Sequence, residues 1–199
     1  MLIKTNRLLK SNNLIESRLK EFKQMSQNDT QEWFSELCFC ILTANSKAEN
    51  ALRIQQEIGT NGFINLTEQA ISEIIKKHKH RFHNNKAKFI AQARFFIDIK
   101  DKIKDLSGPQ AREFIAKNIK GLGFKEASHF LRNVGYDDVA IIDRHILRFM
   151  LQQKLITSIP KHLSVKFYLK CEQILSKFEI ALSRLDLIIW QKMTGNVLK

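Results

Sequence analysis

The amino-acid sequence predicts an all-α fold. Apolar residues recur three and four positions apart through most of the chain, which is the period of an amphipathic helix. No stretch sustains the strict apolar–polar alternation of a half-buried strand. The chain holds only two prolines and seven glycines, a composition that favours long helices over turn-rich β structure. With 199 residues, 44% of them hydrophobic, and no internal repeat, residues 1–199 are expected to form one unit with a sizeable core.

Capping residues delimit the helices expected in the first hundred residues. Asn28-Asp29-Thr30 precedes an almost entirely apolar stretch, and a helix that is apolar all round belongs in the middle of a bundle. Ser46, Thr67 and Asn84-Asn85-Lys86 are expected to open three further helices. The segment from Gly59 to Gly62 is expected to break the chain. The expected helices are 4–25 (one helix or two), 31–43, 46–58, 67–78 and 86–104.

The second half of the chain is also expected to be helical, after a break at Ser107-Gly108-Pro109. Gly135 can supply a left-handed cap at the end of one helix. Asp143 follows the apolar run 139–142 and stands where another helix begins. The expected helices are 111–118, 125–134, one beginning at 143, 161–178 and 180–193.

Two glycines shape the connection between helices 111–118 and 125–134. Gly121 and Gly123 flank Leu122, and glycine permits positive φ and close approach of the backbone to another molecule. The unit 111–135 therefore reads as a helix-hairpin-helix. Its hairpin amides and the positive end of its second helix suit a phosphate oxygen.

Lys125 and Asp143 each have an ordinary structural interpretation. Lys125 can be a solvated lysine in the first turn of its helix, and Asp143 can be an N-cap whose carboxylate accepts a backbone amide. Their combination favours a catalytic interpretation, because the lysine comes two residues after the glycine hairpin and the aspartate opens the next helix.

The charge of the chain points to a polyanionic partner. Thirty-three basic residues against twenty acidic ones give a net charge of +13 and a pI near 9.8. Segment 76–88 is the most basic stretch and surrounds the single aromatic residue Phe82. It can be a solvated face, or a loop that contacts nucleic acid. Its three histidines lack companion carboxylates or cysteines, so no metal site is expected there.

The three cysteines, Cys38, Cys40 and Cys171, form neither a disulfide framework nor a metal-ligand set. Cys38 and Cys40 lie in an apolar run and are expected in the core. The four closely spaced cysteines of an iron–sulfur cluster are not in the sequence. No stretch approaches the ~18 apolar residues of a membrane span, and the amino terminus lacks the apolar region of a signal peptide. We expect the protein in the reducing cytoplasm or nucleoid.

The hairpin, Lys125 and the segment Ile142-Asp143-Arg144-His145 resemble the signature of base-excision DNA glycosylases. The lysine marks the branch of that superfamily that also cuts the strand. The longer strings GFKEASHFLRNVGY and VAIIDRHI, together with LCFCILTANS and a terminal lysine, look like the compact archaeal-type 8-oxoguanine DNA glycosylase/lyases. The resemblance covers most of the chain. One departure is that Asp137-Asp138-Val139 stands where a proline or glycine commonly precedes the aspartate.

This resemblance implies a fold and a reaction. The fold has two helical lobes, one of about residues 26–120 and one of about 1–25 plus 121–199, with the cleft between them and the hairpin unit 111–135 at the cleft. Lys125 would attack C1′ of the damaged nucleotide, since a primary amine can form a Schiff base that drives β-elimination. Asp143 would stabilise the positive charge that develops at C1′. The substrate would be double-stranded DNA containing damaged guanine, bound by a monomer.

The resemblance also suggests roles for other residues. Asn45 matches a polar residue that contacts the orphaned base, and it can equally be a helix C-cap. Phe82 can wedge between stacked bases or anchor its loop in the core. His145 looks like a phosphate-contacting position and can also be a buried, satisfied histidine. Trp190 would stack on the flipped base, and Lys199 would reach the base pocket with its carboxylate. No cofactor or metal is required, although the carbonyls of Lys120 and Leu122 can hold a monovalent cation.

Two other functional classes fit parts of the sequence. A non-catalytic helix-hairpin-helix module that only grips DNA has no need for a lysine at 125 with an aspartate at 143. The same fold can also act on another lesion. The missing cluster cysteines argue against an oxidised pyrimidine, and the reactive lysine argues against an alkylated purine.

Overall fold

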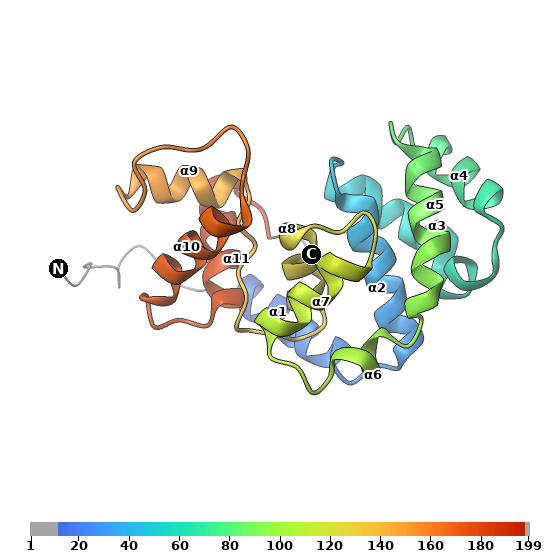
Figure 1. Ribbon diagram of the computed structural model, residues 1–199, viewed down its shortest axis with the longest axis horizontal. Coiled ribbons are helices and arrows are strands. Elements are labelled where there is room, and N and C mark those ends of the chain that lie inside the picture. The colour runs from blue at the N-terminus through green and yellow to red at the C-terminus, as the bar shows by residue number, and fades with distance from the viewer. Residues whose placement is uncertain (1–11, 198–199) are drawn as a thin grey trace.

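The computed structural model describes residues 12–197, and this part of the chain is helical without a strand. The all-α prediction is confirmed (Figure 1). The helices are α1 (Asn13–Met25), α2 (Thr30–Thr43), α3 (Ala48–Asn65), α4 (Glu68–Lys77), α5 (His83–Ala93), the 3-10 helix η1 (Arg94–Phe96), α6 (Ile99–Ile103), α7 (Gly108–Asn118), α8 (Phe124–Asn133), α9 (Arg144–Gln152), α10 (Val165–Ser176) and α11 (Leu182–Thr194).

The buried apolar residues form two clusters. The first contains residues of the helices from α2 to α8, and Val139 is its last residue in the sequence. The second begins again at Ala140, contains α9, α10 and α11, and takes Ile15 and Phe22 from α1. Figure 1 shows α9, α10 and α11 together at one end of the molecule and α2 to α5 at the other. α8 packs in the first cluster, although its place in the sequence had put it in the second lobe. The division into one lobe of about residues 26–120 and another of about 1–25 plus 121–199 stays a prediction.

The apolar helix α2 lies in the middle of the first cluster, as predicted. Residues 33–42 are all buried, and the helix contacts α3, α5, α6 and α8. Asp29 caps it by accepting a hydrogen bond from the amide of Glu32 at 2.9 Å. Cys38 and Cys40 are buried free thiols within it, which confirms the expected core role. α2 is therefore the element against which the hairpin helix α8 is placed.

The expected start of α3 is wrong, whereas the expected break at Gly59 is confirmed. Lys47, not Ser46, precedes this helix, and Lys47 makes no side-chain cap bond. The left-handed residue Asn45 (φ 60°) lies in the turn between α2 and α3. Gly59 takes the non-helical φ of 65°, so a kink there divides α3 into two helical parts, the second of which ends at Asn65.

The expected helix 86–104 is divided into α5, η1 and α6. The chain bends where the Arg94 side chain donates hydrogen bonds to the carbonyls of Phe63 and Leu66 at the end of α3. The expected cap at 84–86 is also wrong, since α5 begins at His83. Lys86 points inward instead, and its amine donates to the carbonyl of Ile41 at 2.6 Å.

Ser107-Gly108-Pro109 opens α7 rather than breaking the chain. Ser107 and Gln110 form a capping box, and Pro109 lies in the first turn, where its missing N–H is not needed. The Gly108 amide donates to Asp138 Oδ2 at 2.9 Å. These contacts fix the start of α7, and with it the hairpin that follows. The last two helices begin at 165 and 182, a few residues later than expected.

Candidate active site

The hairpin between α7 and α8 has the predicted form, and its two glycines are used differently. Gly121 takes φ 91°, and a Cβ there would lie 2.6 Å from Cδ2 of Phe89. Gly123 has a negative φ and is the N-cap of α8, without a side-chain cap bond. The first amides of α8 are therefore not covered by a capping side chain. This is the arrangement in which a helix N-terminus can bind an anion.

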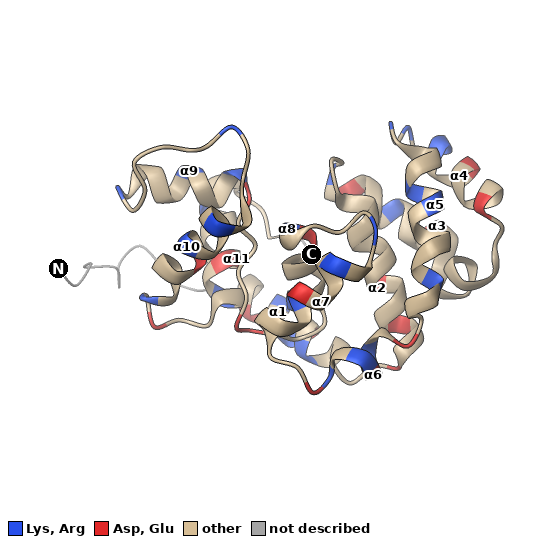
Figure 2. Ribbon diagram, in the orientation of Figure 1, with Lys and Arg blue, Asp and Glu red and all other residues tan. Residues whose placement is uncertain are grey.

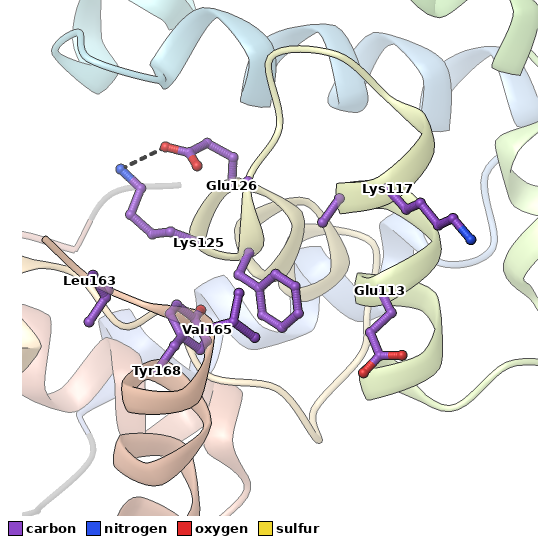
Figure 3. Close-up of a pocket in the computed structure, with 10 residues that line it drawn as sticks. Glu113, Lys117, Lys125, Glu126, Leu163, Val165 and Tyr168 are labelled. Atoms are coloured by element: carbon purple, nitrogen blue, oxygen red, sulfur yellow. Dashed lines mark ion pairs between the residues drawn. The ribbon is translucent and has the colours of Figure 1, made fainter.

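Lys125 is the second residue of α8, and its amine lies 3.0 Å from Oε1 of Glu126. Figure 3 shows this ion pair at the edge of the cavity next to α8. The Lys125 side chain is 39% exposed, against 15% for Glu126. The amine is thus held near the positive end of a helix and can still reach a molecule outside the protein.

A second lysine, Lys86, is buried close to this pair. Burial lowers the pKa of Lys86 to about 8, while the negative charge of Glu126 raises it and the positive charge of Lys125 lowers it. Sequence reasoning missed this residue, because a lysine within the charged run 76–88 carries no mark of burial. Two amines and one carboxylate therefore interact beside the hairpin.

Asp143 is the N-cap of α9, as predicted. Its Oδ1 accepts hydrogen bonds from the amides of His145 (2.8 Å) and Ile146 (2.9 Å). Both cap bonds use the same oxygen, so Oδ2 lies outside the cap. The cap fixes the carboxylate without occupying both of its oxygens.

Lys125, Asp143 and Trp190 line one cleft of about 420 Å³. The three residues come from the start of α8, the start of α9 and the last turns of α11. The cleft thus unites an amine, a carboxylate and an aromatic ring that are far apart in the sequence. Its other lining residues include Ser46, Lys47, His129, Arg132, Ile141, Asp186 and Asn196.

Lys125 also lines a second, more apolar groove of about 690 Å³. Figure 3 shows Leu163, Val165 and Tyr168 along this groove, with Glu113 and Lys117 on α7. The groove contains neither Asp143 nor Trp190. The smaller cleft therefore holds the candidate catalytic pair, and Lys125 stands between the two hollows.

A buried ion pair between Arg132 and Asp186 forms part of the cleft wall. The pKa of Asp186 is raised to about 6: burial raises it most, the charge of Arg132 lowers it, and the charge of Asp143 raises it. Neither residue was singled out from the sequence, since no local pattern connects α8 with α11. Asp143 therefore has a second carboxyl group in its surroundings.

The other predicted site residues differ in whether they line the cleft. Trp190 packs edge-to-face on His145, with 4.8 Å between ring centroids. Its indole nitrogen is buried and has no hydrogen-bond partner within residues 12–197. Asn45 is exposed next to the cleft residue Ser46. Phe82 is half-buried beneath the Arg81 guanidinium, 4.5 Å from the ring centroid, and lines neither hollow.

Lys199 lies outside the described residues. Asn196 lines the cleft, and Val197 is buried in the second apolar cluster. The described end of the chain thus runs along the cleft.

Residues 12–197 contain neither a metal-ligand cluster nor a membrane-spanning helix. No group of three or more His, Cys, Asp or Glu side chains in that range could hold a metal ion. None of the described helices is long and apolar enough to cross a membrane.

Comparisons with known proteins point to one family. The family model described as 8-oxoguanine DNA glycosylase matches residues 15–183. An 8-oxoguanine DNA glycosylase/AP lyase of Methanocaldococcus jannaschii is 50% identical in an alignment 207 residues long, gaps included, that covers 100% of both chains. One from Thermotoga maritima is 43% identical over 92% of this chain and 91% of its own length.

Solved structures give the same picture. The crystal structure of the Methanocaldococcus jannaschii 8-oxoguanine glycosylase/lyase in complex with a 15mer DNA containing 8-oxoguanine superposes with a TM-score of 0.92 over 100% of both chains, at 50% identity. A trapped endonuclease III–DNA covalent intermediate has a TM-score of 0.58 at 15% identity, covering 96% of this chain and 90% of its own. That second likeness concerns the fold alone.

Proposed function

Because the chain belongs to the 8-oxoguanine DNA glycosylase family, we propose that it excises 8-oxoguanine with Lys125 as the nucleophile and Asp143 as its partner. It is a DNA repair enzyme of the glycosylase/AP lyase type. The observation that carries the residue assignment is that Lys125 and Asp143, from two different helices, line one cleft together with Trp190.

The first step is attack of the Lys125 amine on C1′ of the damaged nucleotide. The C1′–N bond breaks and its electron pair leaves with the base, which must gain a proton. Attack requires the neutral amine, so Lys125 has to give up both a proton and its ion pair with Glu126. Glu126 Oε1, at 3.0 Å, is placed to accept that proton.

The role of Asp143 follows from the charge that develops during this step. As the base departs, positive charge builds on the sugar, and a carboxylate held near C1′ stabilises it. The cap bonds to Oδ1 fix the carboxylate, while Oδ2 is free of them. The sugar ring then opens: the C1′–O4′ bond breaks, O4′ takes a proton, and the nitrogen lone pair forms an iminium with C1′. This iminium makes a C2′ proton acidic, and loss of that proton expels the 3′ phosphate by β-elimination.

Binding of DNA is assigned to the surfaces around the cleft. The amides of Gly121 and Gly123 and the start of α8 would bind a phosphate, with His145 contacting another. Asn45 would face the orphaned base, and Phe82 would wedge into the stack. The hairpin carbonyls can hold a monovalent cation that bridges to phosphate.

Recognition of the base is assigned to Trp190 and Lys199. Trp190 would stack on the flipped base at the cleft, and the terminal carboxylate of Lys199 would read the N7 hydrogen that 8-oxoguanine has and guanine lacks. The enzyme would act as a monomer with two lobes, on the duplex DNA of the nucleoid.

Borohydride trapping tests this assignment directly. A duplex containing 8-oxoguanine should form a covalent adduct with the wild-type chain, since borohydride reduces the Schiff base. Lys125→Gln should form no adduct and should still bind the duplex. Lys117→Gln, which removes an exposed lysine of the neighbouring groove, is the matched control and should trap normally.

Two outcomes would contradict the proposal. Normal trapping by Lys125→Gln would place the nucleophile elsewhere. Duplex binding by the wild type without any adduct would favour a non-catalytic DNA-binding module. Parallel duplexes with an oxidised pyrimidine or an alkylated purine show whether 8-oxoguanine is preferred.

A further inference from the structure

Residues 139–142, which lead to Asp143, form no helix and have no neighbouring strand within residues 12–197. The main chain of residues 139–142 is buried, and buried backbone groups need hydrogen-bond partners. Side chains of α10 supply them. The Ala140 amide donates to Glu172 Oε1 at 2.8 Å, and the Tyr168 hydroxyl donates to the Ala140 carbonyl at 2.6 Å. The Ile142 amide donates to the Tyr168 oxygen at 3.2 Å.

The same tyrosine also contacts the helix that carries Lys125. Its oxygen lies 3.0 Å from Oγ of Ser128, one turn after Lys125. Because the tyrosine hydrogen is used by Ala140, the serine hydroxyl is the donor in this contact. The Tyr168 ring packs edge-to-face on Phe124, the residue before Lys125, at 5.7 Å between centroids.

A buried arginine holds Tyr168 and Glu172 in place. Arg112 is 1% exposed and binds both Glu172 carboxylate oxygens, at 2.6 and 2.8 Å. Its guanidinium lies over the rings of Phe124 (5.0 Å) and Tyr168 (5.4 Å). Burial raises the pKa of Tyr168 well above its usual value, so the hydroxyl stays a donor throughout the working pH range.

We propose that Tyr168 is a positioning residue that sets the separation between Lys125 and Asp143. One hydroxyl group is hydrogen-bonded both to the helix that carries Lys125 and to the segment that leads to Asp143. This inference rests on the proposed roles of Lys125 and Asp143. Tyr168 itself lines the neighbouring groove and not the cleft, so it acts through these two residues.

The expected consequence is a loss of chemistry without a loss of binding. Reacting groups displaced by a fraction of an ångström lose much of their advantage, and a displacement of about 1 Å can cost roughly 100-fold. Tyr168→Phe keeps the ring contacts with Phe124 and Arg112 and removes only the hydroxyl. The single-turnover rate of 8-oxoguanine excision should fall about tenfold or more, while duplex affinity changes less than about twofold.

Tyr136→Phe is the matched control. The Tyr136 hydroxyl also donates to a backbone carbonyl, that of Ile103, at 2.7 Å. That hydrogen bond goes to α6 and involves no residue of segment 139–142. Tyr136→Phe should lower the melting temperature to a similar degree and leave the excision rate unchanged. An equal fall in rate for both variants would mean that lost stability, not lost positioning, is responsible.

A double-mutant cycle tests whether Tyr168 acts through Asp143. In an Asp143→Asn background, Tyr168→Phe should have little further effect on the single-turnover rate. The same fold-change in both backgrounds would overturn the proposal, as would an unchanged rate in Tyr168→Phe alone. If Tyr168→Phe does not fold, Ser128→Ala removes the α8 end of the link and should also slow excision. An Asp143→Asn variant with normal activity would instead refute the proposed role of Asp143.

Discussion

At the scale of single residues, Asp143 combines an observed structural cap with a proposed catalytic role. The sequence predicted the cap from the position of Asp143 at a helix start, and the structure confirms it through Oδ1. The catalytic role stays a proposal, supported by the shared cleft with Lys125. The two roles can be separated because the cap needs only a hydrogen-bond acceptor, whereas the proposed catalytic role needs a negative charge.

Asp143→Asn should separate them. Asparagine caps helices about as well as aspartate, so the melting temperature should change little. Loss of the negative charge should slow base release by about 100-fold or more. Excision kinetics and thermal unfolding on the same preparation provide the measurement. A large fall in stability at near-normal turnover would leave Asp143 with the structural role alone.

Asp186 makes a pH-dependent contribution to stability. Its pKa is raised from about 3.8 to about 6, chiefly by burial. A raised carboxyl pKa means that the folded state binds the extra proton between these values. This contribution to stability is therefore complete below pH 3.8 and is lost as the pH rises through 6.

The stability of the wild type relative to Asp186→Asn should thus fall between pH 4 and pH 7, by about 3 kcal/mol in the free energy of unfolding. Urea unfolding at several pH values measures the difference. The exposed Asp137→Asn is the control and should show no such trend. A difference that is constant with pH would contradict the shifted pKa.

Single residues differ in how far the sequence could reveal them. Lys125 and Asp143 belong to a local pattern, so their spacing, their helix positions and the family resemblance were enough to propose them as site residues. Arg132 and Asp186 meet only because α8 and α11 pack together, and nothing local in the sequence marks that contact. Lys86 was mistaken for a surface cap because its burial depends on how α5 lies against α2.

At the scale of elements, the hairpin between α7 and α8 is the unit whose form the sequence predicted best. Both glycines were predicted to serve the close approach of DNA. The structure shows that Gly121 is also required by the protein itself, since its φ is positive and Phe89 fills the space beside it. A Cβ on Gly123 would meet only Glu126 Oε2, at 3.5 Å.

Alanine substitutions should therefore differ at the two glycines. Gly121→Ala should destabilise the fold by about 1–3 kcal/mol through backbone strain, aggravated by the contact with Phe89, and should weaken DNA binding. Gly123→Ala should cost less than about 1 kcal/mol. Urea unfolding and duplex binding test both variants. Equal effects at the two positions would argue against this description of the hairpin.

Element boundaries were less predictable than the elements themselves. Ser107-Gly108-Pro109 was interpreted as a break and is in fact a capped helix start, because a serine and a glutamine three residues later form the cap together. The bend after α5 depends on hydrogen bonds from Arg94 to the end of α3. Both boundaries depend on side-chain hydrogen bonds, which the apolar period of the helices does not reveal.

At the scale of the whole molecule, the all-α fold was predictable and the division of the core was not. The apolar period of a helix can be read from the local sequence. The division of the core into two clusters between Val139 and Ala140 depends instead on how the helices pack. The charge of +13 was also available from composition. Figure 2 shows lysine and arginine on helices at both ends of the molecule, interspersed with acidic residues.

This charge predicts a strong dependence of duplex binding on salt. Each phosphate that the protein neutralises releases condensed counterions, so affinity should fall by about 100-fold or more between 50 and 200 mM salt. Fluorescence anisotropy with an undamaged duplex measures it. An uncharged osmolyte at equal osmolality is the control and should have little effect. A flat salt response would contradict binding through the DNA backbone.

The division of the core into two clusters has a consequence for DNA cleavage by partly unfolded molecules. α8, with Lys125, packs mainly in the first cluster, while segment 140–142 and α9, with Asp143 at its start, belong to the second. Neither half contains the complete catalytic pair. A molecule whose second half has opened by local unfolding keeps its glycine hairpin but lacks the carboxylate and Trp190. If the proposed roles of Lys125 and Asp143 hold, we expect such a molecule to bind DNA without cleaving it.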